Sequence, residues 1–87
     1  MYKISFTNAY IKHLKKLSQP EQRQVAKKLA LLAENPAYPS LRTKLVKGQD
    51  GIWESSVNMD IRIIWRYKGT TIIATLDVGH HDILKKF

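Results

Sequence analysis

Three runs of β-branched and aromatic residues dominate the C-terminal half of the chain. They cover residues 52–57 (IWESSV), 61–67 (IRIIWRY) and 71–78 (TIIATLDV), and two short turns, Asn58-Met59-Asp60 and Lys68-Gly69-Thr70, separate them. Residues of these types pack well in strands, and turns this short make consecutive strands antiparallel. The chain is therefore predicted to build an antiparallel β-meander and to need a cover for its buried face.

The N-terminal half has the sequence pattern of one strand and two helices, and the helices can cover that face. Apolar and polar residues alternate over 2–6, which predicts a first strand. Apolar residues at helical spacing then predict a helix that Thr7 or Asn8 caps and that runs to Leu17. The segment SQPE resembles a capping box that starts a second helix, which runs over 18–34 before Asn-Pro ends it.

The order β-α-α-β-β-β predicts an α+β fold in which a helical hairpin packs on one face of an antiparallel sheet. Residues 36–51 hold two prolines and two glycines, and we interpret them as a loop. With 87 residues the chain forms one small domain spanning 1–87.

Composition and the N-terminal sequence limit the cellular compartment and the kinds of partner that we expect. The chain has no cysteine, so neither disulfides nor a thiolate nucleophile are available. The N-terminal MYKISF alternates side chains and lacks the apolar run of a signal peptide or membrane anchor, so we expect a cytoplasmic protein with no membrane partner. A formal net charge of +8 predicts attraction to polyanions such as nucleic acid or an acidic protein.

Strand alternation predicts which face each side chain occupies. The helix-covered face would carry the apolar set Trp53, Val57, Ile61, Ile63, Trp65, Ile72, Ala74, Leu76 and Val78. The opposite face would be open and polar, with Glu54, Ser56, Arg62, Ile64, Arg66, Ile73, Thr75 and Asp77. Cross-strand ion pairs of Glu54 with Arg66 or of Asp77 with Arg62 are the plain structural interpretation of these charges.

The sequence resembles the RelE/ParE superfamily of bacterial type II toxins over essentially its whole length. The resemblance lies in KLVKGQDGIWE, IRIIWRY and VGHHD, in this order after a lysine-rich helical hairpin. It implies the RelE-like fold and a toxin that a cognate antitoxin neutralises. RelE-like members are ribosome-dependent mRNA endonucleases (mRNA interferases), whereas ParE-like members inhibit DNA gyrase.

The resemblance also implies roles for particular residues of the nuclease branch. Arg62 matches its strand-borne arginine, and His80, His81 and Phe87 fall in the C-terminal stretch that holds an acid or base and a late aromatic. Lys44 and Lys47 match its basic loop. This chain departs from some relatives in having Glu54 and Ser56 where they have lysines, and Phe87 where tyrosine is common.

These residue types suit the chemistry of metal-independent RNA cleavage. Histidine can exchange the protons of the ribose 2′-OH and the leaving 5′-oxygen near neutral pH, and an arginine can clamp the phosphate oxygens. By position we favour His81 as the acid or base, with His80 as the alternative. Residues expected only to hold RNA are Lys44, Lys47, Lys85, Lys86 and Phe87. No metal or cofactor is expected, and His13 is predicted to be solvated.

The expected partners are a short acidic antitoxin in a toxin–antitoxin hetero-oligomer, and the ribosome with its mRNA. Two alternatives stay open: a ParE-like gyrase inhibitor, and a catalytically silent relative that only binds antitoxin or RNA. The nuclease hypothesis requires Arg62 and a histidine of the tail to meet over the uncovered face of the sheet.

Overall fold

The computed structural model describes residues 1–87 and has the predicted order of elements with three additions. In chain order these are β1 (Lys3–Phe6), α1 (Asn8–Leu14), α2 (Gln19–Glu34), the 3₁₀ turn η1 (Pro39–Leu41), β2 (Lys44–Leu45), β3 (Trp53–Ser56), β4 (Ile61–Lys68), β5 (Ile72–His80) and the 3₁₀ helix η2 (His81–Lys86). Two of the additions, η1 and β2, lie in residues 36–51, so the prediction of a plain loop there was wrong in part. The third is η2.

The helix boundaries follow the predicted capping chemistry. Thr7 caps α1 by accepting a hydrogen bond from the backbone N–H of Tyr10. Ser18 and Glu21 form the reciprocal capping box of α2, each side chain accepting from the other residue's backbone N–H. These caps satisfy N–H groups that have no partner inside a helix, and Asn35 ends α2 as predicted.

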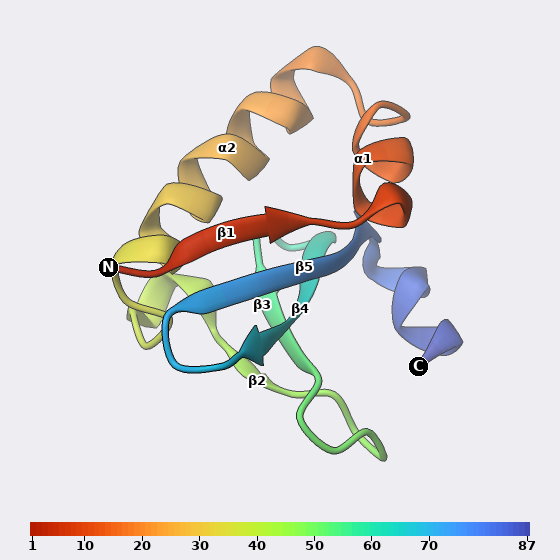
Figure 1. Ribbon diagram of the computed structural model, residues 1–87. Helices are drawn as coiled ribbons and strands as arrows, with labels where there is room; N and C mark the ends of the chain where they lie inside the picture. Colours follow the sequence, from red (N-terminus) through yellow and green to blue (C-terminus); the bar gives the residue numbers. More distant parts are fainter.

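The sheet has five strands in the order β1-β5-β4-β3-β2 (Figure 1). The meander of β3, β4 and β5 is antiparallel, but β1 pairs parallel to β5, so the sheet is mixed and not antiparallel throughout as predicted. Alternation within a strand fixes its faces but carries no signal for the direction in which it pairs with a distant strand. Figure 1 shows α1 and η2 at the same end of β5.

A register shift in β5 changes which of its residues face the helices. Ile64 pairs with Asp77 whereas Trp65 pairs with Thr75, so Leu76 is an extra residue in β5. Ile73 consequently joins the helix-side core and Thr75 is fully buried, while Leu76 packs with the cluster on the other face. The predicted faces of residues 72–76 were therefore wrong, because a bulge inverts the alternation beyond it.

The second face of the sheet is not open. Val46, Ile64 and Ile83 form a small apolar cluster there, against which Ile52, Leu76, Leu84 and Phe87 also pack. The C-terminal helix η2 thus folds back over β4 and β5 and covers Ile64, which is 0% exposed. The prediction of an open polar face was wrong, since the tail supplies apolar residues that remove this surface from water.

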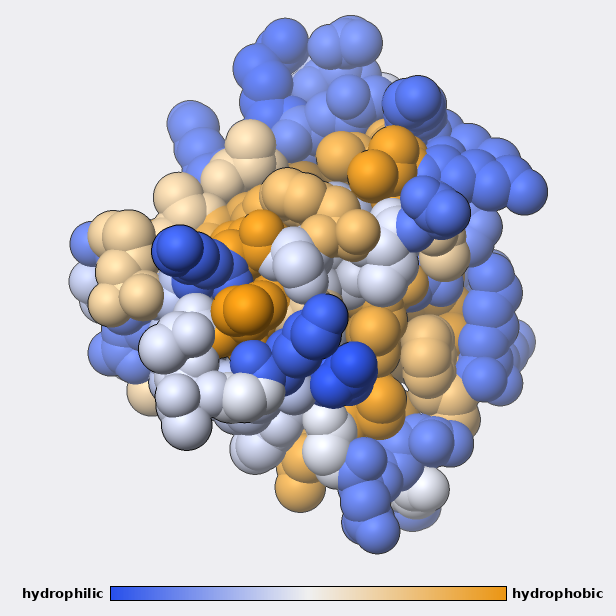
Figure 2. Space-filling view, viewed as in Figure 1, coloured by the Kyte–Doolittle hydropathy of each residue, from blue (hydrophilic) through white to orange (hydrophobic).

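Figure 2 shows apolar surface through the middle of this face and extending to its lower border, with hydrophilic residues along the top and the right-hand border. None of the helices combines the length and hydrophobicity that a membrane crossing requires.

The phenol of Tyr10 is buried without a partner. Tyr10 is 1% exposed in the helix-side core, and its hydroxyl oxygen makes no hydrogen bond. Burial raises the pKa of Tyr10 to about 12, so the group stays protonated at neutral pH.

We expect Tyr10→Phe to stabilise the chain by about 1 kcal/mol, since it removes an unsatisfied polar atom and keeps the ring. Urea unfolding measures this; a variant less stable than the parent would contradict it.

Candidate functional site

Arg62 is held against the turn that joins β3 to β4. Its Nη1 donates hydrogen bonds to the carbonyl oxygens of Asn58 (2.9 Å) and Ile61 (3.2 Å). Its Nε lies 3.7 Å from Oε1 of Glu54, so Glu54 pairs with Arg62 and not with Arg66 as predicted. Nη2 makes no hydrogen bond within the chain, which leaves it as the guanidinium nitrogen available to an anion.

Arg62 and His80 lie on opposite faces of the sheet. Ile61 pairs with His80 and Arg62 pairs with Gly79, and directly opposed residues point to the same side. Ile61 belongs to the helix-side core, whereas Arg62 shares the face of Ile64, two residues further along β4. The hypothesis that His80 meets Arg62 over one face was therefore wrong.

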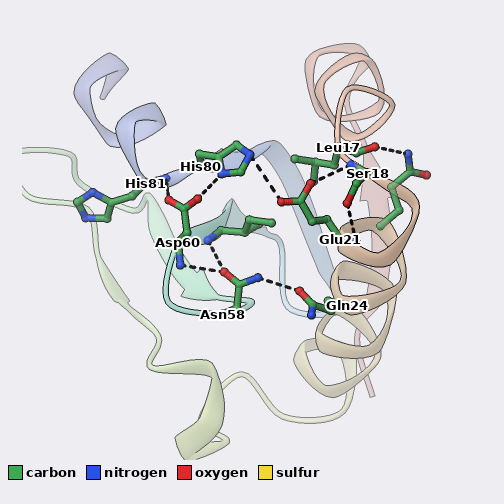
Figure 3. A network of polar contacts seen from close by, with 10 residues as sticks. Leu17, Ser18, Glu21, Gln24, Asn58, Asp60, His80 and His81 are labelled. Atoms are coloured by element: carbon green, nitrogen blue, oxygen red, sulfur yellow. Dashed lines mark hydrogen bonds and ion pairs between the residues drawn. The ribbon is translucent and has the colours of Figure 1, made fainter.

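His80 is instead part of a polar network on the helix side (Figure 3). Its Nδ1 is hydrogen-bonded to Oδ2 of Asp60, and its Nε2 lies 3.8 Å from Oε2 of Glu21 at the start of α2. Asp60 also accepts a hydrogen bond from the backbone N–H of His81 (3.2 Å). One carboxylate of the β3–β4 turn thus contacts both histidines at the point where β5 becomes η2.

The network shifts the protonation of its members. The hydrogen bond to Asp60 raises the pKa of His80 above its ordinary value of 6.5. The hydrogen bond from His80, and then that from the His81 N–H, lowers the pKa of Asp60 below 3.8. The stabilisation from His80 is complete below pH 6.5 and is lost as the pH rises through its raised pKa, while that from Asp60 is present above 3.8 and is lost as the pH falls through its lowered pKa.

His81 begins η2 and is exposed. Figure 3 shows its imidazole directed away from His80 and from α2, while its backbone N–H points to Asp60. Because η2 packs on the face of Ile64 and Arg62, His81 is the tail histidine whose segment crosses to the arginine's side. Its side chain makes no hydrogen bond within the chain.

His13 is not a solvated residue. Its Nδ1 lies 2.5 Å from Oδ1 of Asp77, and the Asp77 side chain is only 6% exposed. The same carboxylate oxygen accepts a hydrogen bond from the Val78 N–H (2.8 Å). Sequence reasoning missed this pair because the two residues lie 64 positions apart, and no local pattern predicts a contact between such distant side chains.

The lysines predicted to hold RNA are exposed. Lys44 lies in β2 opposite Glu54, Lys47 follows it in the connecting segment, and Lys85 and Lys86 lie on η2. Phe87 is half-buried against the Val46–Ile64–Ile83 cluster, so it has a packing role in place of the predicted free ring. No group of three or more His, Asp or Glu side chains is arranged to hold a metal ion.

Comparison with known proteins identifies the fold. No protein-family model and no curated protein sequence matches the chain. Solved structures match over nearly its whole length. YafQ from E. coli strain BL21(DE3) matches at 15% identity and TM-score 0.77, covering 97% of this chain and 98% of that one. The YoeB/ParE toxin from Agrobacterium tumefaciens matches at 13% identity and TM-score 0.77, covering 91% and 98%.

The intact E. coli RelBE toxin–antitoxin complex contains a chain that matches at 21% identity and TM-score 0.73, covering 91% of this chain and 95% of that one. The chain therefore has the RelE-like fold of toxins from type II toxin–antitoxin systems.

The Asp60 network predicts a specific change in titration. We expect Asp60→Asn to return the pKa of His80 toward its ordinary value of 6.5, because it removes the largest cause of the rise. Asp82→Asn is the matched control, since Asp82 acts on His80 only through space and should change its pKa much less. NMR titration of the His80 imidazole measures both; equal pKa values in the parent and Asp60→Asn would contradict the network.

Proposed function

We propose that this chain is the toxin of a type II toxin–antitoxin pair and that it cleaves mRNA on the ribosome without a metal ion. Arg62 would bind the scissile phosphate through its free Nη2, and His81 would act as the general acid or base. Asp60 would position His81 by accepting a hydrogen bond from its backbone N–H. Lys44, Lys47, Lys85 and Lys86 would bind the RNA backbone.

Two observations support this proposal: contacts within the chain orient the Arg62 guanidinium, and the His81 imidazole has no hydrogen-bond partner in the protein. The carbonyl groups of Asn58 and Ile61 and the carboxylate of Glu54 orient the Arg62 guanidinium before any substrate arrives. Such preorganised donors lower the cost of stabilising charge that develops on a phosphorane. His81 has both ring nitrogens free of protein partners and lies two residues beyond Gly79, the residue paired with Arg62.

The roles of the two histidines follow from their environments. His80 is bonded to one carboxylate and lies beside a second, on the face away from Arg62, so it suits a positioning role. His81 is the proposed catalytic group. The 2′-OH would lose its proton as its oxygen attacks phosphorus, and the leaving 5′-oxygen would gain one, which yields a 2′,3′-cyclic phosphate and a 5′-hydroxyl.

The proposed partner is an acidic antitoxin. Solved structures with this fold include the E. coli RelBE and DinJ-YafQ toxin–antitoxin complexes. The net charge of +8 favours an acidic partner through long-range attraction. The gyrase-inhibitor and silent-relative alternatives from the sequence have no specific observation in their favour.

We expect Arg62→Ala and His81→Ala each to reduce cleavage of translated mRNA by at least about a hundredfold, since each removes a group that acts in the transition state. The measurement is primer extension on mRNA recovered from a translation reaction, followed by analysis of the new 3′ ends for cyclic phosphate.

Arg66→Ala is the matched control, because Arg66 is an exposed arginine of the same strand and should leave cleavage near the parent level. Cleavage that survives both test substitutions would contradict the assignment. Broken DNA with gyrase attached, while translation continues, would support the gyrase alternative.

A further inference from the structure

A groove at the end of β5 is not lined by Arg62. It has a volume of about 240 Å³ and lies between the end of α1, the end of β5 and η2. Its apolar lining comes from Leu17, Val78 and Ile83, and its polar lining from His13, Lys16, His80, Asp82 and Lys86. Figure 1 shows the two helical segments that border it at one end of β5.

His13 presents one free nitrogen at this groove. Its Nδ1 is bonded to the buried Asp77, which fixes the ring orientation and leaves Nε2 without a hydrogen-bond partner in the protein. A buried carboxylate behind a histidine is an arrangement that holds the outer nitrogen ready to bond to a ligand. The proposed cleavage chemistry at Arg62 and His81 does not use this pair.

The charges around the groove favour an anion. Lys16 and Lys86 stand on its two sides, one on the α1 end and one on η2, and no hydrogen bond or ion pair occupies either ammonium group. Asp77 contacts His13, and Asp60 and Glu21 share His80; none of these three carboxylates lines the groove. Asp82 is the one carboxylate that does, against two lysines.

We propose that this groove binds one nucleotide unit of single-stranded RNA. The phosphate contacts Lys16, Lys86 and Nε2 of His13, and the base lies on the apolar floor of Leu17 and Ile83. A phosphate with an attached base matches a groove of two cations over an apolar floor better than a bare anion does. This second RNA site extends the proposed function, but its binding is measurable on the isolated chain, without ribosome or cleavage.

The test is an NMR titration of the ¹⁵N-labelled chain with a 2′-O-methylated pentaribonucleotide, which cannot form a cyclic phosphate. Inorganic phosphate is the second probe. We expect a saturable shift of His13 Nε2 with the oligonucleotide, and affinity at least about tenfold higher than for phosphate, because the base adds apolar contact.

Two double variants with equal net charge separate the groove from the general field of the protein. Lys16→Glu with Lys86→Glu should weaken oligonucleotide binding at least about fivefold more than Lys12→Glu with Lys15→Glu, since charged contacts to phosphate are lost only in the first. All four lysines are exposed, and thermal melting verifies that both variants fold.

Three results would overturn the proposal: equal losses in the two variants, an unshifted His13 ring, or phosphate binding as tightly as the oligonucleotide. Loss of mRNA cleavage by His81→Ala is independent of all three, so the failure of one proposal is distinguishable from the failure of the other.

Discussion

The contact of Ile83 with Gly79 and Ile64 determines where the C-terminal helix lies. A sheet in a chain this small has two faces to cover, and α1 and α2 can cover only one. The tail covers the other, and its approach is so close that a methyl group on Gly79 would lie 2.7 Å from Cγ2 of Ile83. Carbon atoms that are not bonded prefer about 3.5–4.0 Å, so only glycine permits this packing.

A polar contact adds to the apolar one at the same place. Asp60 binds the ring of His80 and the backbone N–H of His81, so the β3–β4 turn is tied to the start of η2 while Ile83 holds its middle. The two histidines are thereby separated: His80 lies on the helix side, and His81 leads into the segment on the Arg62 side. Adjacent residues at the end of a strand have different surroundings because the strand alternation sends them to opposite faces.

Local chemistry made much of the fold predictable. The capping box at Ser18, the turns of the meander and the alternation in β4 each depend on neighbours in the sequence, and the structure confirms them. The parallel pairing of β1, the bulge that turns Ile73 inward and the folding back of the tail depend on distant partners, and no local pattern predicts these. The pairing of His13 with Asp77 was missed for the same reason. The only sequence signal for Asp60 was its place in the turn before Ile61, the residue that pairs with His80.

The most direct test of the tail packing is the nuclear Overhauser effect between the γ2-methyl group of Ile83 and the α-protons of Gly79 in solution. We expect a strong cross-peak together with dispersed chemical shifts over residues 81–87. Absence of that cross-peak, with random-coil shifts for the tail, would contradict the packing on which the positions of His81 and of the nucleotide groove depend.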